Sequence, residues 1–410
     1  MKIQTNTSIL NIKKFSKYAV NYGGKESSYS NECEITMLVI YNKNNSPFII
    51  ISADIIWFSE EIVENCLNEI FKILNINKQN IVFCASHTHG TPNPNKDILY
   101  GKYSERFNIT LKENLKQLVK STLSKNKINV SMHSENIKAP NVSINRRKKA
   151  LQFKSFPLLQ TQSLPNDKRQ IDNHINIIQI VNNDTDLIEC IILKHTCHPV
   201  ADENKVIGAD YPGFLKKYIK ESITKNIVFM QGFCGDIRPN VIKNNISIKD
   251  KIIKLIIGDR FRKSKNGDSE YISKKIFKSL KYDINSNKTL INGPMRSISK
   301  SIKIELENNT LAPRNIEITI WLWEATCFIF VNAEVLSGYI MNNYKNLNII
   351  NVGYTNGMFG YLPTEKDILE AGYEVNKSRK YFKINDKLKT NNEAKIKNEI
   401  KKMINSLYIK

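Results

Sequence analysis

The chain of 410 residues is 41% hydrophobic and carries a formal net charge of +22. A chain of this length and composition can bury a large core, which excludes an intrinsically disordered protein. It has no apolar run of roughly 18 residues that could span a bilayer, and its N-terminus lacks the charged and then apolar pattern of a secretion signal. We therefore expect a cytoplasmic protein with no transmembrane segment. The seven cysteines form no Cys-x-x-Cys pair and are expected to be reduced thiols.

The positive charge raises the question of a polyanionic partner. A basic surface attracts nucleic acid or an acidic membrane, but the lysines here are spread along the chain and are not interleaved with stacking aromatic residues. We therefore do not expect nucleic acid as a partner. A polyanion-binding protein stays open as an alternative, and its association would weaken steeply with salt.

The first predicted elements form a strand, helix and strand unit. The continuous apolar run at 47–56 predicts a strand buried on both faces. Ser59 predicts the N-cap of a helix whose apolar positions continue at helical spacing to Leu74. A second strand is predicted at 80–86, and Ser86-His87-Thr88-His89-Gly90 lies at its carboxyl end.

The elements that follow continue to alternate between helix and strand. In chain order we predict a helix at 105–123, strands at 175–181 and 187–194 joined by a hairpin turn, a helix at 212–223, a strand at 226–231, a helix at 270–280, strands at 316–323 and 326–331, a helix at 335–344, a strand at 349–354, a loop at 355–364 and a helix at 391–407. This alternation predicts the α/β class, with a mixed, largely parallel sheet flanked by helices and an active site at strand carboxyl ends.

The sequence shows no internal repeat and no linker that would divide it. We therefore expect a single domain over residues 1–410. Within it we expect a lysine-rich surface excursion at 244–268 and a C-terminal helical tail at 376–410.

Two pairs of histidines follow predicted strands. His87 and His89 are two residues apart and project to one side of the extended chain, and His195 and His198 follow the apolar run at 187–193. Because metal ligands usually come from several elements, the two pairs indicate a site that holds a divalent metal or moves a proton. The alternative for each histidine is a hydrogen-bonded structural residue.

Five blocks of the sequence together resemble the neutral/alkaline ceramidase family. In order they are Ser86-His87-Thr88-His89; Cys197-His198-Pro199 with Gly208-Ala209-Asp210; Gly235-Asp236-Ile237-Arg238-Pro239-Asn240; the acid Glu334; and Tyr361-Leu362-Pro363-Thr364 with Tyr373 after it. The resemblance implies an α/β catalytic domain that holds one Zn2+ ion through two histidines, a glutamate and a tyrosine.

Carried over by motif, the resemblance implies that His87, His198, Glu334 and Tyr361 are the zinc ligands. His198 is preferred to His195 because it alone stands in the Cys-His-Pro context. The alternative for Tyr361 is a loop aromatic that packs on the core.

The resemblance also implies catalytic roles for three other residues. His89 would be a proton shuttle beside the metal, Arg146 in Asn145-Arg146-Arg147 would polarise the substrate, and Tyr373 would donate a hydrogen bond to the developing oxyanion. The alternative for Arg146 is a basic surface turn. The supporting candidates, which would orient histidines or hold loops, are Asp54, Asp210 and Asp236.

The chain departs from the family pattern in two places. The ceramidases carry serine in Gly-Asp-x-Ser-Pro-Asn where this chain has Arg238, and arginine cannot act as a hydroxyl nucleophile. Its planar guanidinium suits a carboxylate or phosphate, so we expect Arg238 to bind an anionic substrate group. The chain also ends soon after the tyrosine block, so we expect neither the additional β-sandwich domain of the ceramidases nor ceramide as the substrate.

The sequence thus predicts a zinc-dependent hydrolase that cleaves the amide bond of a small polar or anionic N-acyl molecule, such as an N-acylated amino sugar or glycan precursor. The alternative is a non-catalytic glycan- or lipid-binding protein on a degenerate ceramidase scaffold, which would be expected to have lost at least one of the four ligands. Whether the bond is an amide or an ester, and what the oligomeric state is, stay open.

Overall fold

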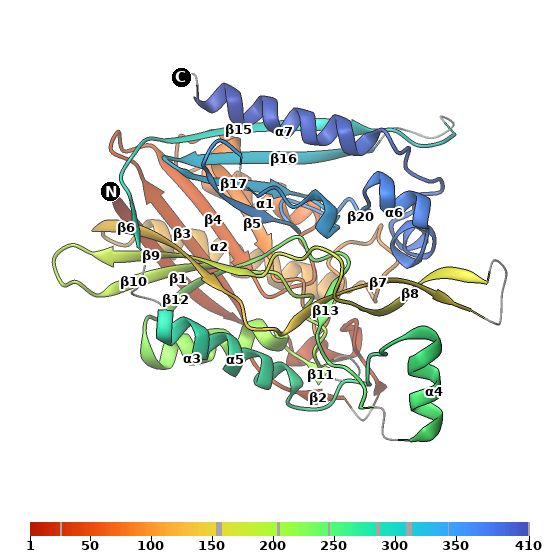
Figure 1. The fold of residues 1–410 in the computed structure, drawn as a ribbon. Helices are drawn as coiled ribbons and strands as arrows, with labels where there is room; N and C mark the ends of the chain where they lie inside the picture. The colour runs from red at the N-terminus through yellow and green to blue at the C-terminus, as the bar shows by residue number, and fades with distance from the viewer. Residues whose placement is uncertain are drawn as a thin grey trace.

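Two β-sheets pack face to face at the centre of the computed structural model (Figure 1). The structure describes residues 1–410 except 25–26, 153–157, 203–205, 245–246, 284–287, 309–313, 343 and 409–410. Its strands are β1 Lys2–Leu10, β2 Ser28–Tyr29, β3 Cys33–Tyr41, β4 Pro47–Ala53, β5 Ile81–Ala85, β6 Ile128–Lys138, β7 Ser143–Leu151, β8 Leu159–Asn166, β9 His174–Asn182, β10 Ile188–His195, β11 Val206–Ile207, β12 Asn226–Gln231, β13 Ile237–Pro239, β14 Thr289–Ile291, β15 Met295–Ile304, β16 Arg314–Trp323, β17 Thr326–Val331, β18 Glu334–Val335, β19 Asn348–Val352 and β20 Tyr361–Leu362. Its α-helices are α1 Glu60–Phe71, α2 Glu105–Leu123, α3 Asp210–Ser222, α4 Ile248–Ile257, α5 Asp268–Asp283, α6 Glu365–Glu370 and α7 Asn392–Tyr408.

The larger sheet is mixed, which confirms the α/β class but not the expected strand directions. Its order is β12-β10-β9-β6-β1-β3-β4-β5, with β14 added beside β6. In this sheet only β4 with β5 and β10 with β12 run parallel among the described strands. The expectation of a largely parallel sheet was therefore wrong. Strands joined by short connections, such as β3 with β4 and β9 with β10, pair antiparallel. The two parallel pairs are each connected through a helix, α1 between β4 and β5 and α3 between β10 and β12.

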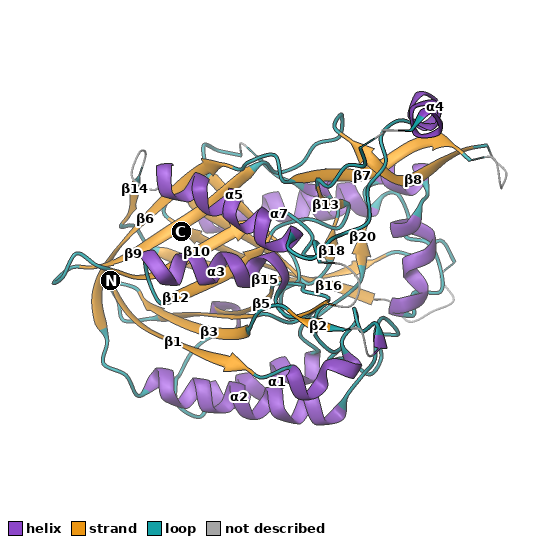
Figure 2. Cartoon of the chain, turned by 90° about the horizontal axis from the view of Figure 1, so that it is seen from below, coloured by secondary structure: helices purple, strands orange, loops and turns teal. Residues whose placement is uncertain are grey.

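Each face of the larger sheet has its own apolar packing. Along β3, Ile35, Met37 and Val39 point into the core beneath α1 and α2, while Leu38 and Ile40 point toward the second sheet. Figure 2 shows α1 and α2 along one half of the sheet and α3 and α5 along the other. The helices thus cover one face, and the other face is left for a sheet.

The second sheet, in the order β15-β16-β17-β19, covers that other face. Aromatic side chains fill the space between the two sheets: the ring centroids of Phe48 and Trp321 lie 5.2 Å apart, edge to face. The outer face of the second sheet packs against α7, which buries Ile400 and Ile404. The predicted tail is therefore part of the core along α7, and residues 409–410 lie outside the described residues.

One prediction on local structure needs correction. The helix expected at 335–344 is absent from the described part of that segment, because Glu334 and Val335 form β18 and pair with β20, and only a single 3-10 turn follows at Ser337–Tyr339. The excursion at 244–268 contains α4, none of whose residues is buried, and residues 245–246 lie outside the described residues. Among the described residues, no helix combines the length and apolarity that a bilayer crossing requires.

The packing of α7 gives a test of the fold. Ile404 is fully buried against the second sheet, so Ile404→Ala leaves a cavity and should lower the free energy of unfolding by about 2–5 kcal/mol. Urea unfolding measures this. The exposed neighbour Lys401, changed to alanine, is the control, and equal stability of both variants with the wild type would contradict the packing of α7.

Candidate metal centre

Two segments that are distant in the sequence bring three imidazoles together. His87 and His89 follow β5, and His198 follows β10. The Nε2 atoms of His87 and His198 lie 3.1 Å apart, and the Nε2 atom of His89 lies 3.4 Å from the first and 3.3 Å from the second. All three residues are buried.

A carboxylate lies beside one of these imidazoles. Glu334 in β18 is buried, and its Oε2 atom lies 3.4 Å from Nε2 of His87. That oxygen accepts no hydrogen bond from any residue that the structure describes. A buried carboxylate oxygen without a hydrogen bond is costly unless a cation compensates its charge. Glu334 is therefore placed as a cation ligand would be.

Backbone carbonyls fix the tautomers of two of the histidines. Nδ1 of His87 lies 2.8 Å from the carbonyl oxygen of Ile56, and Nδ1 of His198 lies 3.3 Å from that of Cys234. Because a carbonyl only accepts, each Nδ1 carries the proton and each Nε2 presents a lone pair. Burial, reinforced by the neighbouring charges, lowers the pKa of His198 well below its usual value, which keeps the ring neutral.

His89 has a different partner. Its Nδ1 atom lies 3.4 Å from the hydroxyl of Tyr100, which can either donate or accept. Its tautomer is therefore not fixed, although burial first, and then the charges of His87 and Arg146, lower its pKa. A ring that can exchange its proton between two nitrogens suits proton transfer better than permanent ligation.

The separations in the cluster fit a zinc ion. Ligand atoms at about 2.0–2.1 Å from a tetrahedral zinc stand about 3.3 Å from one another. The Nε2 atom of His87 lies 3.1 Å from Nε2 of His198 and 3.4 Å from the Glu334 oxygen, which are the separations expected between pairs of zinc ligands. Nitrogen and carboxylate oxygen are also the donors that zinc accepts. The residues present therefore fit the ion that the resemblance implies.

Unusual backbone geometry aims the histidine rings. His87 has a φ of 65° and stacks on Tyr354, whose φ is 57°, with ring centroids 4.1 Å apart. Such positive φ values are rare outside glycine and persist only where the surroundings hold them. Gly208 holds the same loop from the other side. The Thr88 hydroxyl donates to the carbonyl oxygen of Gly208. Gly90 packs so closely against Gly208 that a Cβ atom on Gly90 would lie 2.2 Å from the same oxygen, so only glycine fits there.

Tyr361 and Arg146 lie beside the cluster. Tyr361 in β20 is the register partner of Glu334 in β18. Nη2 of Arg146 donates to the Tyr361 hydroxyl at 3.2 Å and to the carbonyl of Gly235 at 2.8 Å, while its Nε donates to Glu374 at 2.9 Å. Burial and the charge of Glu334 raise the pKa of Tyr361, and Arg146 opposes them. Arg146 is thus an anchored cation rather than the surface turn that the alternative described.

Tyr373 lines a cavity of about 650 Å³ with Arg146. It begins a π-helical turn, and its ring centroid lies 5.8 Å from that of Tyr361. Two exposed lysines, Lys149 and Lys377, also line this cavity and form no ion pair with a described residue. The cavity next to Arg146 therefore has a polar, positively charged lining.

Arg238 lies away from that lining. It is in β13, which pairs with β7, and its guanidinium carbon lies 4.4 Å from the ring centroid of Phe261, in the lysine-rich excursion. It is not among the described residues that line the cavity beside Arg146. The structure thus places the expected anion-binding arginine where the excursion meets β13.

The three supporting aspartates hold loops. Asp236 accepts hydrogen bonds from Asn145 and from the backbone and hydroxyl of Ser337, which ties β7, the 234–236 loop and the segment after Glu334 together. Asp54 accepts from the backbone of Glu34 and pairs with Lys216 of α3.

Asp210 accepts from the backbone of Asp202 and of Tyr211. The hydroxyl of Tyr211 lies 3.2 Å from Nδ1 of His195, which is a buried structural residue outside the cluster. Burial is the main cause that lowers the pKa of His195 to about 3.

Sequence reasoning missed several residues that shape this site. Tyr354 stacks under His87, and Glu374 pairs with Arg146 and Arg147. Glu374 directly follows Tyr373, so a buried acid opposite the Asn-Arg-Arg block could have been sought there. No sequence signal points to Tyr354 or to the carbonyls of Ile56 and Cys234.

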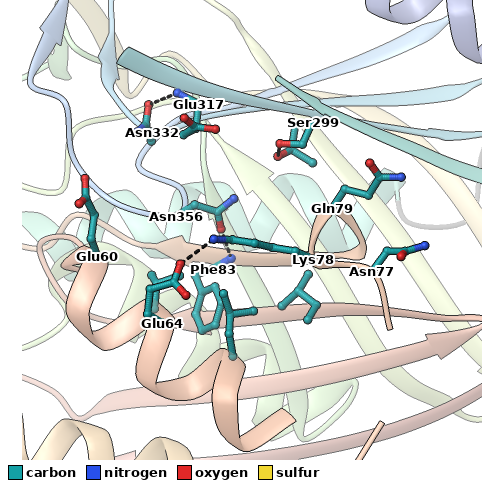
Figure 3. A pocket seen from close by; sticks show the side chains of 14 residues that line it. Glu60, Glu64, Asn77, Lys78, Gln79, Phe83, Ser299, Glu317, Asn332 and Asn356 are labelled. Atoms are coloured by element: carbon teal, nitrogen blue, oxygen red, sulfur yellow. Dashed lines mark hydrogen bonds and ion pairs between the residues drawn. The ribbon is translucent and has the colours of Figure 1, made fainter. Parts of the chain in front are cut away.

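A cavity of about 720 Å³, larger than the one beside Arg146, is not this site. It lies between α1 and the second sheet, where Figure 3 shows Glu64 paired with Lys78 and Asn332 bonded to the backbone of Glu317. The cluster histidines line neither this cavity nor the one beside Arg146, but Arg146 bonds to Tyr361 and so connects the second cavity to the cluster. Volume therefore does not identify the reactive centre here.

Asp210 gives a pH test. Burial, with the charge of Asp202, raises the pKa of Asp210 from 3.8 to about 7 in the folded protein. The folded state therefore keeps a proton that the unfolded state releases, so this contribution to stability is present below pH 4 and is lost as the pH rises through 7. The free energy of unfolding of the wild type should fall between pH 5 and pH 8, and in Asp210→Asn, which cannot lose this proton, that fall should be smaller by about 1 kcal/mol or more. Urea unfolding at the two pH values measures the difference. An unchanged pH dependence in the variant would contradict the raised pKa.

Comparisons with known proteins agree with this arrangement at the level of the fold. No protein-family model matches the chain, and no curated protein matches it in sequence. Among solved structures, a neutral ceramidase from Pseudomonas aeruginosa superposes with a TM-score of 0.67 at 12% identity, covering 91% of this chain and 70% of that one. A ceramidase described as complexed with C2 superposes with a TM-score of 0.69 at 11% identity, covering 91% and 71%. The chain therefore has the fold of the neutral ceramidases.

Proposed function

We propose that this protein is a zinc-dependent hydrolase that cleaves the amide C–N bond of N-acyl compounds. The observation that carries the proposal is the buried cluster of the His87, His89 and His198 nitrogens inside a ceramidase fold, with a Glu334 oxygen beside His87 that accepts no hydrogen bond from a described residue. A buried set of neutral imidazoles and a carboxylate has little structural use without a cation, because their lone pairs face one another.

His87, His198, Glu334 and Tyr361 are assigned as the metal ligands. The carbonyl partners of the two histidines support this assignment because they leave Nε2 free to coordinate. Zinc held by these residues would polarise a carbonyl and lower the pKa of a bound water toward about 7.

The other residues would act on the substrate and its protons. Arg146, held by Glu374 and Gly235, would polarise the scissile carbonyl, and the Tyr373 hydroxyl would donate to the oxyanion that develops from it; that both line one cavity supports these roles. His89 would take the proton of the attacking water and deliver it to the leaving amine, using the exchangeable tautomer that Tyr100 permits.

The cavity supports a polar, anionic substrate. Lys149 and Lys377 offer ammonium groups at its wall that pair with no acid among the described residues, together with Gln160 and Gln162. An N-acylated amino sugar or glycan precursor with a phosphate or carboxylate would suit them. We place the enzyme in the cytoplasm, which its seven free cysteines favour.

Metal analysis of variants tests the ligand assignment. Purified wild-type protein should contain one equivalent of zinc, and His87→Ala should lose it. His89→Gln should keep the zinc but lose at least about a hundredfold in kcat on N-acyl amino sugars, because only proton transfer is removed. The exposed His174, changed to alanine, is the control. Loss of zinc from His89→Gln would make His89 a ligand, and full activity after chelation would refute the metal role.

Tyr373→Phe tests the oxyanion donor. Removing the hydroxyl should lower kcat by about 10²–10³ with zinc content and KM nearly unchanged, because the bond is made chiefly in the transition state. Tyr381→Phe, which removes a nearby hydroxyl outside this cavity, should have little effect. Steady-state kinetics decides, and an unchanged kcat for Tyr373→Phe would remove this residue from the mechanism.

A further inference from the structure

Helix α4 presents an apolar stripe to solvent. The exposed fractions of Ile248, Ile252, Leu255 and Ile256 are 77%, 52%, 87% and 47%. At about 100° per residue these four positions share one face of the helix. Large aliphatic side chains gathered in this way on a protein surface usually mark a contact with another body.

Lysines border this stripe on both sides. At the same angular spacing, Lys249 lies along one edge of the stripe and Lys251 along the other. Both are exposed, and neither forms an ion pair with a described residue. The helix face is therefore apolar in the middle and positively charged at its margins.

The opposite side of α4 holds it to the protein. Ile253 and Ile257 are half-buried, and Asp250 pairs with Lys243 and Arg260 at the base of the excursion. The two arms of that base pair through a bridge between Ile242 and Phe261. The exposed stripe is thus the free side of an anchored helix and not the result of a loosely attached segment.

The helix stands out beside the β7–β8 hairpin in both views (Figures 1 and 2). The close approach of Lys148 to Gly258 joins the two. Leu151 and Leu159, which pair in that hairpin, are 39% and 56% exposed and add apolar surface on the same side. This side of the molecule also carries the cavity that Tyr373 lines.

We propose that α4 docks the protein on an anionic lipid bilayer, with the aliphatic stripe inserted at the level of the headgroups and Lys249 and Lys251 against the lipid phosphates. Apolar residues in the middle and lysines at the margins are the pattern of an interfacial amphipathic helix. A second copy of the chain is a poorer occupant because it would bring the lysine margins of two positively charged molecules together. The proposal is independent of the hydrolase assignment.

Vesicle sedimentation with the full chain tests the docking. The protein should sediment with vesicles that contain phosphatidylglycerol and remain in solution with pure phosphatidylcholine, and added salt should release it. The double variant Ile252→Ser, Leu255→Ser should bind at least about tenfold more weakly because it removes most of the inserted apolar area. The double variant Lys249→Glu, Lys251→Glu should bind at least as weakly.

Matched controls remove the same groups elsewhere. Ile109→Ser with Leu187→Ser removes two other exposed aliphatic side chains, and Lys120→Glu with Lys401→Glu reverses two charges on α2 and α7. Both should bind as the wild type does. Since no residue of α4 is buried, the α4 variants should keep the wild-type melting temperature.

Three results would overturn the proposal. One is equal binding of the wild type to both kinds of vesicle, and another is wild-type binding by the α4 variants. The third is a dimer in gel filtration that only the Ile252→Ser, Leu255→Ser variant dissociates, which would assign the stripe to a second copy.

Discussion

The structure around the site depends on one electrostatic constraint. Three buried imidazole nitrogens lie 3.1–3.4 Å from one another, and the Glu334 oxygen, 3.4 Å from that of His87, has no hydrogen-bond donor among the described residues. Electron pairs that face one another in a low-dielectric interior repel, so the surrounding fold has to hold them there. A cation at their centre turns the same arrangement into an attraction.

The packing of the two sheets creates that meeting point. His87 and His198 extend from strands of the larger sheet, whereas Glu334 follows β17 of the second sheet and is held by its pairing with β20. The aromatic layer around Phe48 and Trp321 fixes the distance between the sheets. The polar ties of Asp236 then lock the loops over the centre.

Local signals in the sequence predicted much of the fold. The helix at 105–123 and the strands at 226–231 and 326–331 have the predicted bounds, because continuous apolar runs and capping residues determine them locally. The polar-rich β1 and the pairing of β18 with β20 were not predicted. These depend on partners far away in the sequence, as does the antiparallel direction of most of the larger sheet.

In the site, too, the residues in local motifs were predicted and those whose position depends on distant segments were not. The histidine motifs at strand ends and the ceramidase-like order of blocks pointed to His87, His198 and Glu334, and the structure brings these together. Arg238 was expected beside them for its chemistry, but its position depends on how the excursion folds back on β13. The stacking of Tyr354 and the carbonyls that fix the tautomers depend on backbone angles, which residue types do not reveal.

A crystal structure with diffraction data collected on both sides of the zinc absorption edge would show whether zinc binds among these side chains. We expect one strong anomalous peak at about 2.0–2.1 Å from Nε2 of His87 and of His198 and from a carboxylate oxygen of Glu334. An absence of any anomalous peak there in protein purified with zinc, with the imidazoles hydrogen-bonded to water or to one another, would contradict it.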